Sequence, residues 1–432
     1  MDNDNMKIGK YNYISLLRNE EIGEILNFIS SSKVIHSLMC VSHRFYDFFS
    51  SDCIYNLCHN VDFVYSLSLD FIQNNKIIYY VVSIITNICC VYPTSFINFN
   101  RLKKMNFNPM NLSYYTFPES LEELQSYACE NLNENYSFVK MTKLKKLNIA
   151  NSNIIDPIFQ ESLEELDVSD CYNLNENYSF AYMKKLKILN VECNNLRNYI
   201  FSDSLEELHA QSCKHLNENY SFANLIKLKK LNISSTNITD PTFPESLEEL
   251  YAFLCKDLNE YYSFRNMRKL KILYVDNTNL KDPIFPESLE ELYARSCKNL
   301  NENYSFANLR KLKILDVCST NLRDPIFTES LEELNASICN NLNENYSFAN
   351  LQKLKILNVS STNLRDPIFP ESLESLCAHS CIYLNVYYSF VKITKLKKLD
   401  IRWTNLIYPI LPESLKRLDA YGCKHLNKLF SS

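Results

Sequence analysis

The sequence predicts an α/β solenoid, in which short, similar segments stack side by side and build one curved parallel sheet. A cysteine recurs every 42 residues over the last three quarters of the chain, and leucines recur at fixed distances from it. The same Pro-Glu-Ser-Leu-Glu-Glu-Leu sequence precedes three of these cysteines, and close variants precede the others. Self-similarity at a fixed period is the signature of repeat architectures. The recurring cysteines are Cys129, Cys171, Cys213, Cys255, Cys297, Cys339, Cys381 and Cys423.

Each 42-residue unit contains two shorter repeats, whose first leucines are 23 and then 19 residues apart. In the copy that spans residues 285–326, the first repeat has Leu289, Leu292, Ala294, Cys297 and Leu300, and the second has Leu312, Leu315, Val317, Thr320 and Leu322. Both halves resemble the leucine-rich repeat, L-x-x-L-x-L-x-x-N/C-x-L, which has a period of roughly 20–29 residues. The half with the proline resembles the short bacterial form of this repeat. Eight double repeats therefore occupy residues 101–432.

The leucine pattern predicts one parallel strand per short repeat. Alternate residues of L-x-x-L-x-L point inward and outward, as in a strand. A single repeat cannot bury its leucines, whereas stacked repeats bury them in a continuous core. We expect residues 304–311 to return along the convex side as a helical turn, with Phe306 and Leu309 pointing inward. Asp324 and Pro325 should form a turn in the other half.

The recurring cysteines are predicted to be structural and reduced. Cysteines of the same phase lie two strands apart, about 10 Å, which is too far for a disulfide or for shared zinc coordination. We expect neither a metal nor a cofactor. The equivalent position of the other half holds mostly threonine: Thr236, Thr278, Thr320, Thr362 and Thr404.

An outward position next to each strand alternates in charge, within a chain whose formal net charge is only -5. Stacked strands would place each glutamate between two lysines, which predicts a self-neutralising ladder that fixes register. A nucleic-acid surface needs one clustered sign of charge instead, so we expect no nucleic acid. The glutamates are Glu122, Glu164, Glu206, Glu248, Glu290, Glu332 and Glu374, and the lysines are Lys145, Lys187, Lys229, Lys271, Lys313, Lys355 and Lys397.

Other outward positions vary between copies of the repeat and hold residues typical of binding hot spots, namely tyrosine, tryptophan and arginine. Two interpretations remain open at this point. These positions have either drifted on an unconstrained surface, or they form a patch on the concave side that binds a protein target. The candidates are Tyr251, Phe253, Tyr274, Tyr293, Arg295, His379, Arg402 and Trp403.

A segment without the repeat, residues 11–58, follows a short tail at residues 1–10 and shows helical spacing of apolar residues. Its residues 17–29, LRNEEIGEILNFI, resemble the F-box pattern L-P-x-E-I-L-x-x-I-L-x-F-L, and residues 41–45, VSHRF, resemble the V-C-K-R-W/F of the same family. The resemblance implies a small helical domain that docks on the adaptor subunit of an SCF-type ubiquitin ligase. A plain helical cap on the solenoid is the alternative. The implied docking residues are Leu17, Ile22, Ile25, Val41 and Phe45.

Residues 59–100 connect the two parts. Within them, residues 77–96 align with the repeat 42 residues later, which predicts a degenerate capping repeat. The apolar run in this segment falls short of the roughly 20 residues that a helix needs to span a bilayer. The first residues of the chain lack the apolar region of a signal peptide. We therefore expect a cytoplasmic protein without a membrane partner.

No convergent catalytic constellation stands out, and the 3 glycines lack the spacing of a phosphate-binding loop. The sequence thus predicts a protein-binding scaffold and not an enzyme. The leading hypothesis is a substrate-receptor subunit of an SCF-type ubiquitin ligase, with the concave repeat face binding the target. The alternative is an interaction scaffold with no ubiquitin link.

Overall fold

The computed structural model describes residues 102–107, 116–129, 136–195, 197–216 and 218–423, together with strands β1 (Phe63–Val64) and β2 (Ser83–Thr86). The F-box-like segment, with Leu17, Ile22, Ile25, Val41 and Phe45, lies outside the described residues. The chain divides into two compact units. Unit 1 comprises Met1–Asn175 and Tyr182–Leu189, and unit 2 comprises Glu176–Ala181 and Asn190–Ser432.

Unit 1 contains a parallel sheet. Strand β1 pairs with β2, and the pairing continues through β3 (Lys104–Phe107), β4 (Glu123–Gln125), β5 (Lys146–Asn148) and β6 (Glu165–Asp167). Strand β7 (Ile188–Asn190) falls at the boundary between the units in the sequence. Strand β2 lies within residues 77–96 and pairs with β3, and the capping role of this segment stays a prediction.

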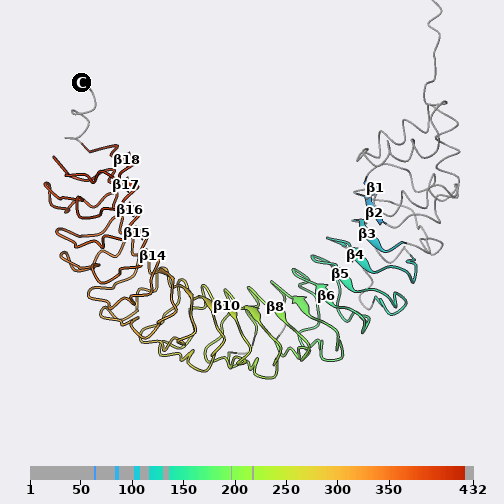
Figure 1. Cartoon of the computed structure of the whole chain (residues 1–432). Coiled ribbons are helices and arrows are strands. Elements are labelled where there is room, and N and C mark those ends of the chain that lie inside the picture. The colour runs from blue at the N-terminus through green and yellow to red at the C-terminus, as the bar shows by residue number, and fades with distance from the viewer. Residues whose placement is uncertain are drawn as a thin grey trace, which may run out of the picture. The chain divides into compact units, whose positions relative to one another are not determined.

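Unit 2 is a longer stack of the same kind, in which each strand pairs in parallel with the next and buried leucines lie in register, such as Leu273 beside Leu292. Within this unit the strands line the inner, concave side of the curve (Figure 1). The predicted single parallel strand per short repeat is confirmed. The strands are β8 (Glu207–His209), β9 (Lys230–Asn232), β10 (Glu249–Tyr251), β11 (Ile272–Tyr274), β12 (Glu291–Tyr293), β13 (Ile314–Asp316), β14 (Glu333–Asn335), β15 (Ile356–Asn358), β16 (Ser375–Cys377), β17 (Lys398–Asp400) and β18 (Arg417–Asp419).

The core lies between the strands and the returning loops. Leu289, Leu292, Leu312 and Leu315 are each 0% exposed. Full burial of a leucine contributes roughly 1.5–3 kcal/mol relative to an exposed one. On the far side, Phe306 is fully buried, and it belongs to a column of equally buried phenylalanines that recurs once per double repeat: Phe138, Phe180, Phe222, Phe264, Phe306, Phe348 and Phe390.

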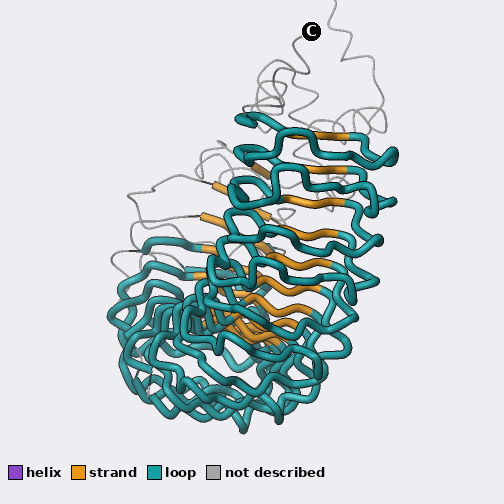
Figure 2. The backbone as a smooth tube through the Cα atoms, turned by 90° about the vertical axis from the view of Figure 1, so that its left-hand side faces the viewer, coloured by secondary structure: helices purple, strands orange, loops and turns teal. Residues whose placement is uncertain are grey.

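The predicted helical turn at residues 304–311 is wrong, although Phe306 and Leu309 do point into the core. The amide of Leu309 donates to the carbonyl of Phe306 at 3.0 Å, and the amide of Leu312 donates to that of Leu309 at 3.0 Å. These bonds span three residues each, so the segment forms two consecutive turns. No helix occurs among the residues that the structure describes (Figure 2). The described part is therefore a parallel β-solenoid and not an α/β solenoid, because repeats of 19 and 23 residues leave little chain for a helix.

The cysteine and threonine columns connect adjacent turns of the solenoid. The Cys297 thiol donates to the carbonyl of Val275 at 3.1 Å and lies 3.3 Å from the hydroxyl of Thr278, which donates to the same carbonyl at 2.7 Å. Burial raises the pKa of the Cys255 and Cys297 thiols, and it raises that of Cys213 to about 12. Because a neutral thiol is a weak nucleophile, the column residues act as small buried hydrogen-bonding groups. They are free cysteines in the structure.

Candidate functional site

The outward face of each strand in unit 2 carries four columns of side chains. At β12 the four columns are represented by Glu290 (column 1), Glu291 (column 2), Tyr293 (column 3) and Arg295 (column 4). All four side chains are at least partly exposed. Leu292, between columns 2 and 3, is fully buried. The Tyr293 hydroxyl donates to the Glu291 carboxylate at 3.0 Å, which places columns 2 and 3 on the same face of the sheet.

Column 1 is the predicted charge ladder, and the structure confirms it. The ammonium of Lys313 lies 2.7 Å from the carboxylate of Glu290, and Lys271 lies 2.7 Å from Glu248. Hydrogen bonding to Lys313 lowers the pKa of Glu290, and the charge of Lys271 on the preceding strand adds to the shift. Glu248 and Glu290 therefore each interact with two lysines and form an ion pair with one of them. Equivalent pairs in unit 2 are Lys229–Glu206, Lys355–Glu332 and Lys397–Glu374, and unit 1 contains Lys187–Glu164.

Column 3 contains a stack of three tyrosine rings on β10, β11 and β12. The ring centres of Tyr251 and Tyr274 lie 4.9 Å apart at an interplanar angle of 12°, and those of Tyr274 and Tyr293 lie 4.1 Å apart at 5°. The ammonium of Lys230 is 5.8 Å from the centre of the Tyr251 ring, and the guanidinium of Arg295 is 5.9 Å from that of Tyr293. Rings and cations thus cover one another's faces, so the stack offers its ring edges to a partner.

The two outer tyrosines are held by carboxylates of column 2. Tyr251 donates to Glu249 at 3.0 Å, as Tyr293 does to Glu291. Burial, with the neighbouring Glu249 carboxylate, raises the pKa of Tyr251 to about 12. Burial likewise raises the pKa of Tyr293, with Tyr274 and Glu291 adding to the shift. Both hydroxyls are therefore neutral hydrogen-bond donors at physiological pH.

Arg295 is positioned by a buried acid. Its guanidinium donates to the carboxylate of Asp316 at 2.7 Å, and the Asp316 side chain is only 6% exposed. The hydrogen bond to Asp316 raises the pKa of Arg295. Phe253 occupies column 4, two residues after Tyr251 of column 3, and its side chain is half-buried. The structure thus brings the sequence-predicted residues of β10–β12 together into one group.

Sequence reasoning missed column 2. In unit 1 this column alternates lysine and glutamate from Lys104 to Glu165, as in the 2.6 Å pair of Lys146 with Glu165, and then holds Ile188 on β7. On β11 and β13 of unit 2, isoleucine stands where lysine would continue the alternation, so Glu291 is in register with Ile272 on one side and Ile314 on the other. A comparison of Lys146 with its equivalents in later repeats could have revealed this break.

The remaining candidates, His379, Arg402 and Trp403, lie on the turns after β16 and β17. Four strand intervals separate β12 from β16, roughly 19 Å, so the structure does not join them to the tyrosine stack. Arg402 is held by its own strand, because it donates to the Asp400 carboxylate at 3.0 and 2.7 Å. This leaves Arg402 less available to a partner than an unpaired arginine would be.

Trp403 occupies a strained position, with φ at 57° and the residue 55% exposed. Most equivalent turns hold the smaller residues serine or asparagine there, and a bulky residue with a positive φ is a conformational outlier. The indole packs over Gly422, where a Cβ atom would overlap the ring, and contacts Tyr421 edge-on at 5.2 Å between ring centres. Trp403 and Gly422 are thus a matched pair in the last described turns.

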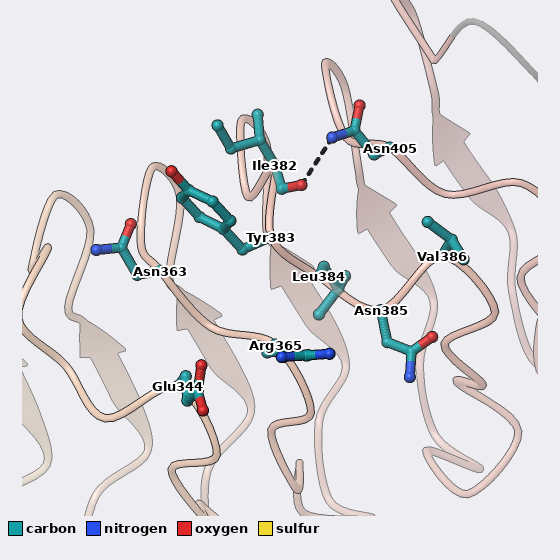
Figure 3. A pocket seen from close by; sticks show the side chains of 9 residues that line it. All are labelled: Glu344, Asn363, Arg365, Ile382, Tyr383, Leu384, Asn385, Val386 and Asn405. Carbon is teal, nitrogen blue, oxygen red and sulfur yellow. Dashed lines mark hydrogen bonds between the residues drawn. The ribbon is translucent and has the colours of Figure 1, made fainter.

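A pocket of about 560 Å³ lies on the loop side of unit 2. Figure 3 shows Glu344 and Arg365 on one side of it and Ile382 and Tyr383 on the other. A pocket of about 540 Å³ occurs one double repeat earlier, where asparagines stand in place of Ile382 and Tyr383. The pocket therefore follows from the repeated loop geometry, and its side chains form no catalytic constellation.

Within the described ranges, no group of three or more histidine, cysteine or acidic side chains is placed to hold a metal ion. The same residues include no helix with the length and apolarity needed to cross a membrane.

No protein-family model matches the chain, and no curated protein matches its sequence. Solved structures do match. YopM, a leucine-rich effector protein from Yersinia pestis, is 27% identical over 71% of this chain and 84% of its own, with a TM-score of 0.53. A leucine-rich-repeat protein of Leptospira interrogans is 16% identical over 85% of this chain and 97% of its own, with a TM-score of 0.50. The Toll structure from the Drosophila Toll–Spätzle complex is 15% identical over 79% of this chain and 53% of its own, with a TM-score of 0.54. The described part of the chain is a parallel β-solenoid with the fold of leucine-rich-repeat proteins.

Proposed function

We propose that this chain is a non-catalytic scaffold in the cytoplasm that binds a protein partner on the concave face of strands β10–β12. The observation that carries the proposal is the stack of Tyr251, Tyr274 and Tyr293, held by hydrogen bonds and flanked by cations. Preorganised aromatic side chains supply contact area at a small cost in conformational entropy. The similarity to leucine-rich-repeat proteins, YopM among them, supports a role in protein interaction.

The test removes the stack without touching the core. The partner is first identified by affinity capture and mass spectrometry. Because truncating an aromatic hot spot costs about 2 kcal/mol or more, Tyr274→Ala with Tyr293→Ala should weaken binding of that partner at least about tenfold. The melting temperature should barely move.

A matched control changes the same column further along the sheet. Asn335→Ala with Asn358→Ala truncates column 3 on β14 and β15 and should leave the affinity within about threefold, because most interface residues contribute little. Equal binding by the tyrosine variant and the control would overturn the proposed site. Arg402 and Trp403 would then be the next residues to test.

A second proposal concerns the N-terminal segment: that it links the scaffold to an SCF-type ubiquitin ligase, with the bound protein as the ligase target. The resemblance of residues 17–29 and 41–45 to the F-box pattern supports it. In the full chain, Ile22→Asp with Ile25→Asp should abolish co-purification with the ligase adaptor. Partner binding through the tyrosine stack should persist. If the unaltered chain does not bind the adaptor, the scaffold has no ubiquitin link.

A further inference from the structure

The acidic groups of β10–β15 are not all neutralised. In column 1, Lys271, Lys313 and Lys355 each bond a column 1 glutamate. In column 2, Glu291 and Glu333 each have isoleucine on both neighbouring strands, and neither forms an ion pair within the described part of the chain. This stretch of the concave face therefore carries unpaired negative charge.

The same column alternates these carboxylates with apolar side chains. Ile272 and Ile314 are half-buried, and Ile356 is 43% exposed. Glutamates on every second strand lie about 9.6 Å apart, since neighbouring parallel strands are spaced by about 4.8 Å. Tyr251 and Tyr293 lie beside Glu249 and Glu291, and the edges of their rings favour apolar or aromatic contacts.

We infer that the partner segment lying across β10–β15 is an extended basic peptide, with arginine or lysine at every third residue and apolar residues between them. This inference rests on the proposed function and specifies the chemistry of the partner. A polyproline II segment advances about 9.3 Å in three residues, close to the spacing of Glu249, Glu291 and Glu333. Each cation would form a charge-assisted hydrogen bond to one carboxylate, and the residues between would lie on Ile272, Ile314 and Ile356.

The geometry disfavours other ligands for this strip. Phosphate groups would meet the unpaired carboxylates of Glu291 and Glu333 as like charges. A single metal ion cannot bridge carboxylates about 9.6 Å apart, because its oxygen ligands lie within about 2.6 Å of it. Charge complementarity and spacing together select a basic polypeptide.

The experiment uses the full chain and a fluorescein-labelled peptide of four Arg-Pro-Pro triplets, since proline and the residue before it favour the polyproline II conformation. Fluorescence anisotropy should detect binding of this peptide and none of its Glu-Pro-Pro counterpart. Glu291→Gln with Glu333→Gln should weaken the binding at least about tenfold, because charge-assisted hydrogen bonds are the stronger kind.

The control removes the same number of charges from column 1. Glu290→Gln with Glu332→Gln should change the affinity by less than about threefold, because both side chains are already bonded to lysine. Equal losses in the two pairs would show attraction by net charge alone and would overturn the inference, as would absence of binding by the Arg-Pro-Pro peptide. Neither result bears on the proposed function, which the partner affinity of the Tyr274→Ala and Tyr293→Ala variant tests separately.

Discussion

Columns 1 and 2 run side by side on the same strands and differ in one respect. In column 1, glutamate and lysine alternate without a break from Glu122 to Lys397, and the pairs are bonded wherever the structure gives a distance, as in Glu290 with Lys313. In column 2, lysine stands at Lys146 and Lys230, whereas isoleucine takes its place at Ile188, Ile272, Ile314 and Ile356. A column that sets register keeps its pattern, and a column free of that task can acquire a binding surface.

The largest effect on stability is expected at Leu292, the buried residue that follows Glu290 of column 1 and Glu291 of column 2. Leu292 is fully buried, so Leu292→Ala should lower the free energy of unfolding by about 2–5 kcal/mol through lost burial and a cavity. Tyr293→Ala, the adjacent outward change, should cost less than about 1 kcal/mol. Chemical denaturation of the full chain measures both. A Tyr293→Ala cost as large as that of Leu292→Ala would mean that the stack is part of the core.

Acid should weaken column 1. Hydrogen bonds from lysine lower the pKa values of Glu248 and Glu290 in the folded chain. Their contribution to stability is therefore present above the unfolded pKa of about 4.3 and is lost as the pH falls through the lower folded value. The melting temperature should drop below about pH 4. Glu248→Gln with Glu290→Gln should make this drop shallower, and an unchanged profile would show that the ladder contributes nothing measurable.

The smallest effect separates the columns by charge reversal. Glu290→Lys places a third lysine between Lys271 and Lys313, and like charges on adjacent strands destabilise a sheet, so we expect a fall in melting temperature of about 1–2 °C. Position 291 is in register with two isoleucines, so Glu291→Lys should lower the melting temperature less. Differential scanning calorimetry at low salt compares them. A reversed order would contradict the assignment of column 1 as the register ladder.

The repeat made much of the fold predictable. Leu292 and Leu315 repeat at fixed spacing, so the strands, the parallel register and the inward face followed from sequence, as did the ion pairs of column 1. The helical turn at residues 304–311 was wrong because apolar spacing at Phe306 and Leu309 fits two successive turns as well as a helix.

The candidate site was predictable in part. Tyr251, Tyr274 and Tyr293 were found because they break a polar column, whereas the stacking and the cations at its ends depend on the closeness of adjacent turns. Glu291 was missed because it repeats in most copies, and only its changed neighbours make it distinctive. The contact between Trp403 and Gly422 could not be predicted from the sequence, because neither residue alone indicates that the two meet between consecutive turns.

The most direct test of the binding surface places lysine on both strands beside Glu291. Ile272→Lys with Ile314→Lys would give Glu291 a lysine on both neighbouring strands, as Glu123 has from Lys104 and Lys146. The Arg-Pro-Pro peptide should then bind at least about tenfold more weakly. The melting temperature should stay the same or rise slightly, because opposite charges on adjacent strands stabilise a sheet. Undiminished peptide binding by a folded variant would contradict the claim that unpaired carboxylates beside the tyrosine stack form the binding surface.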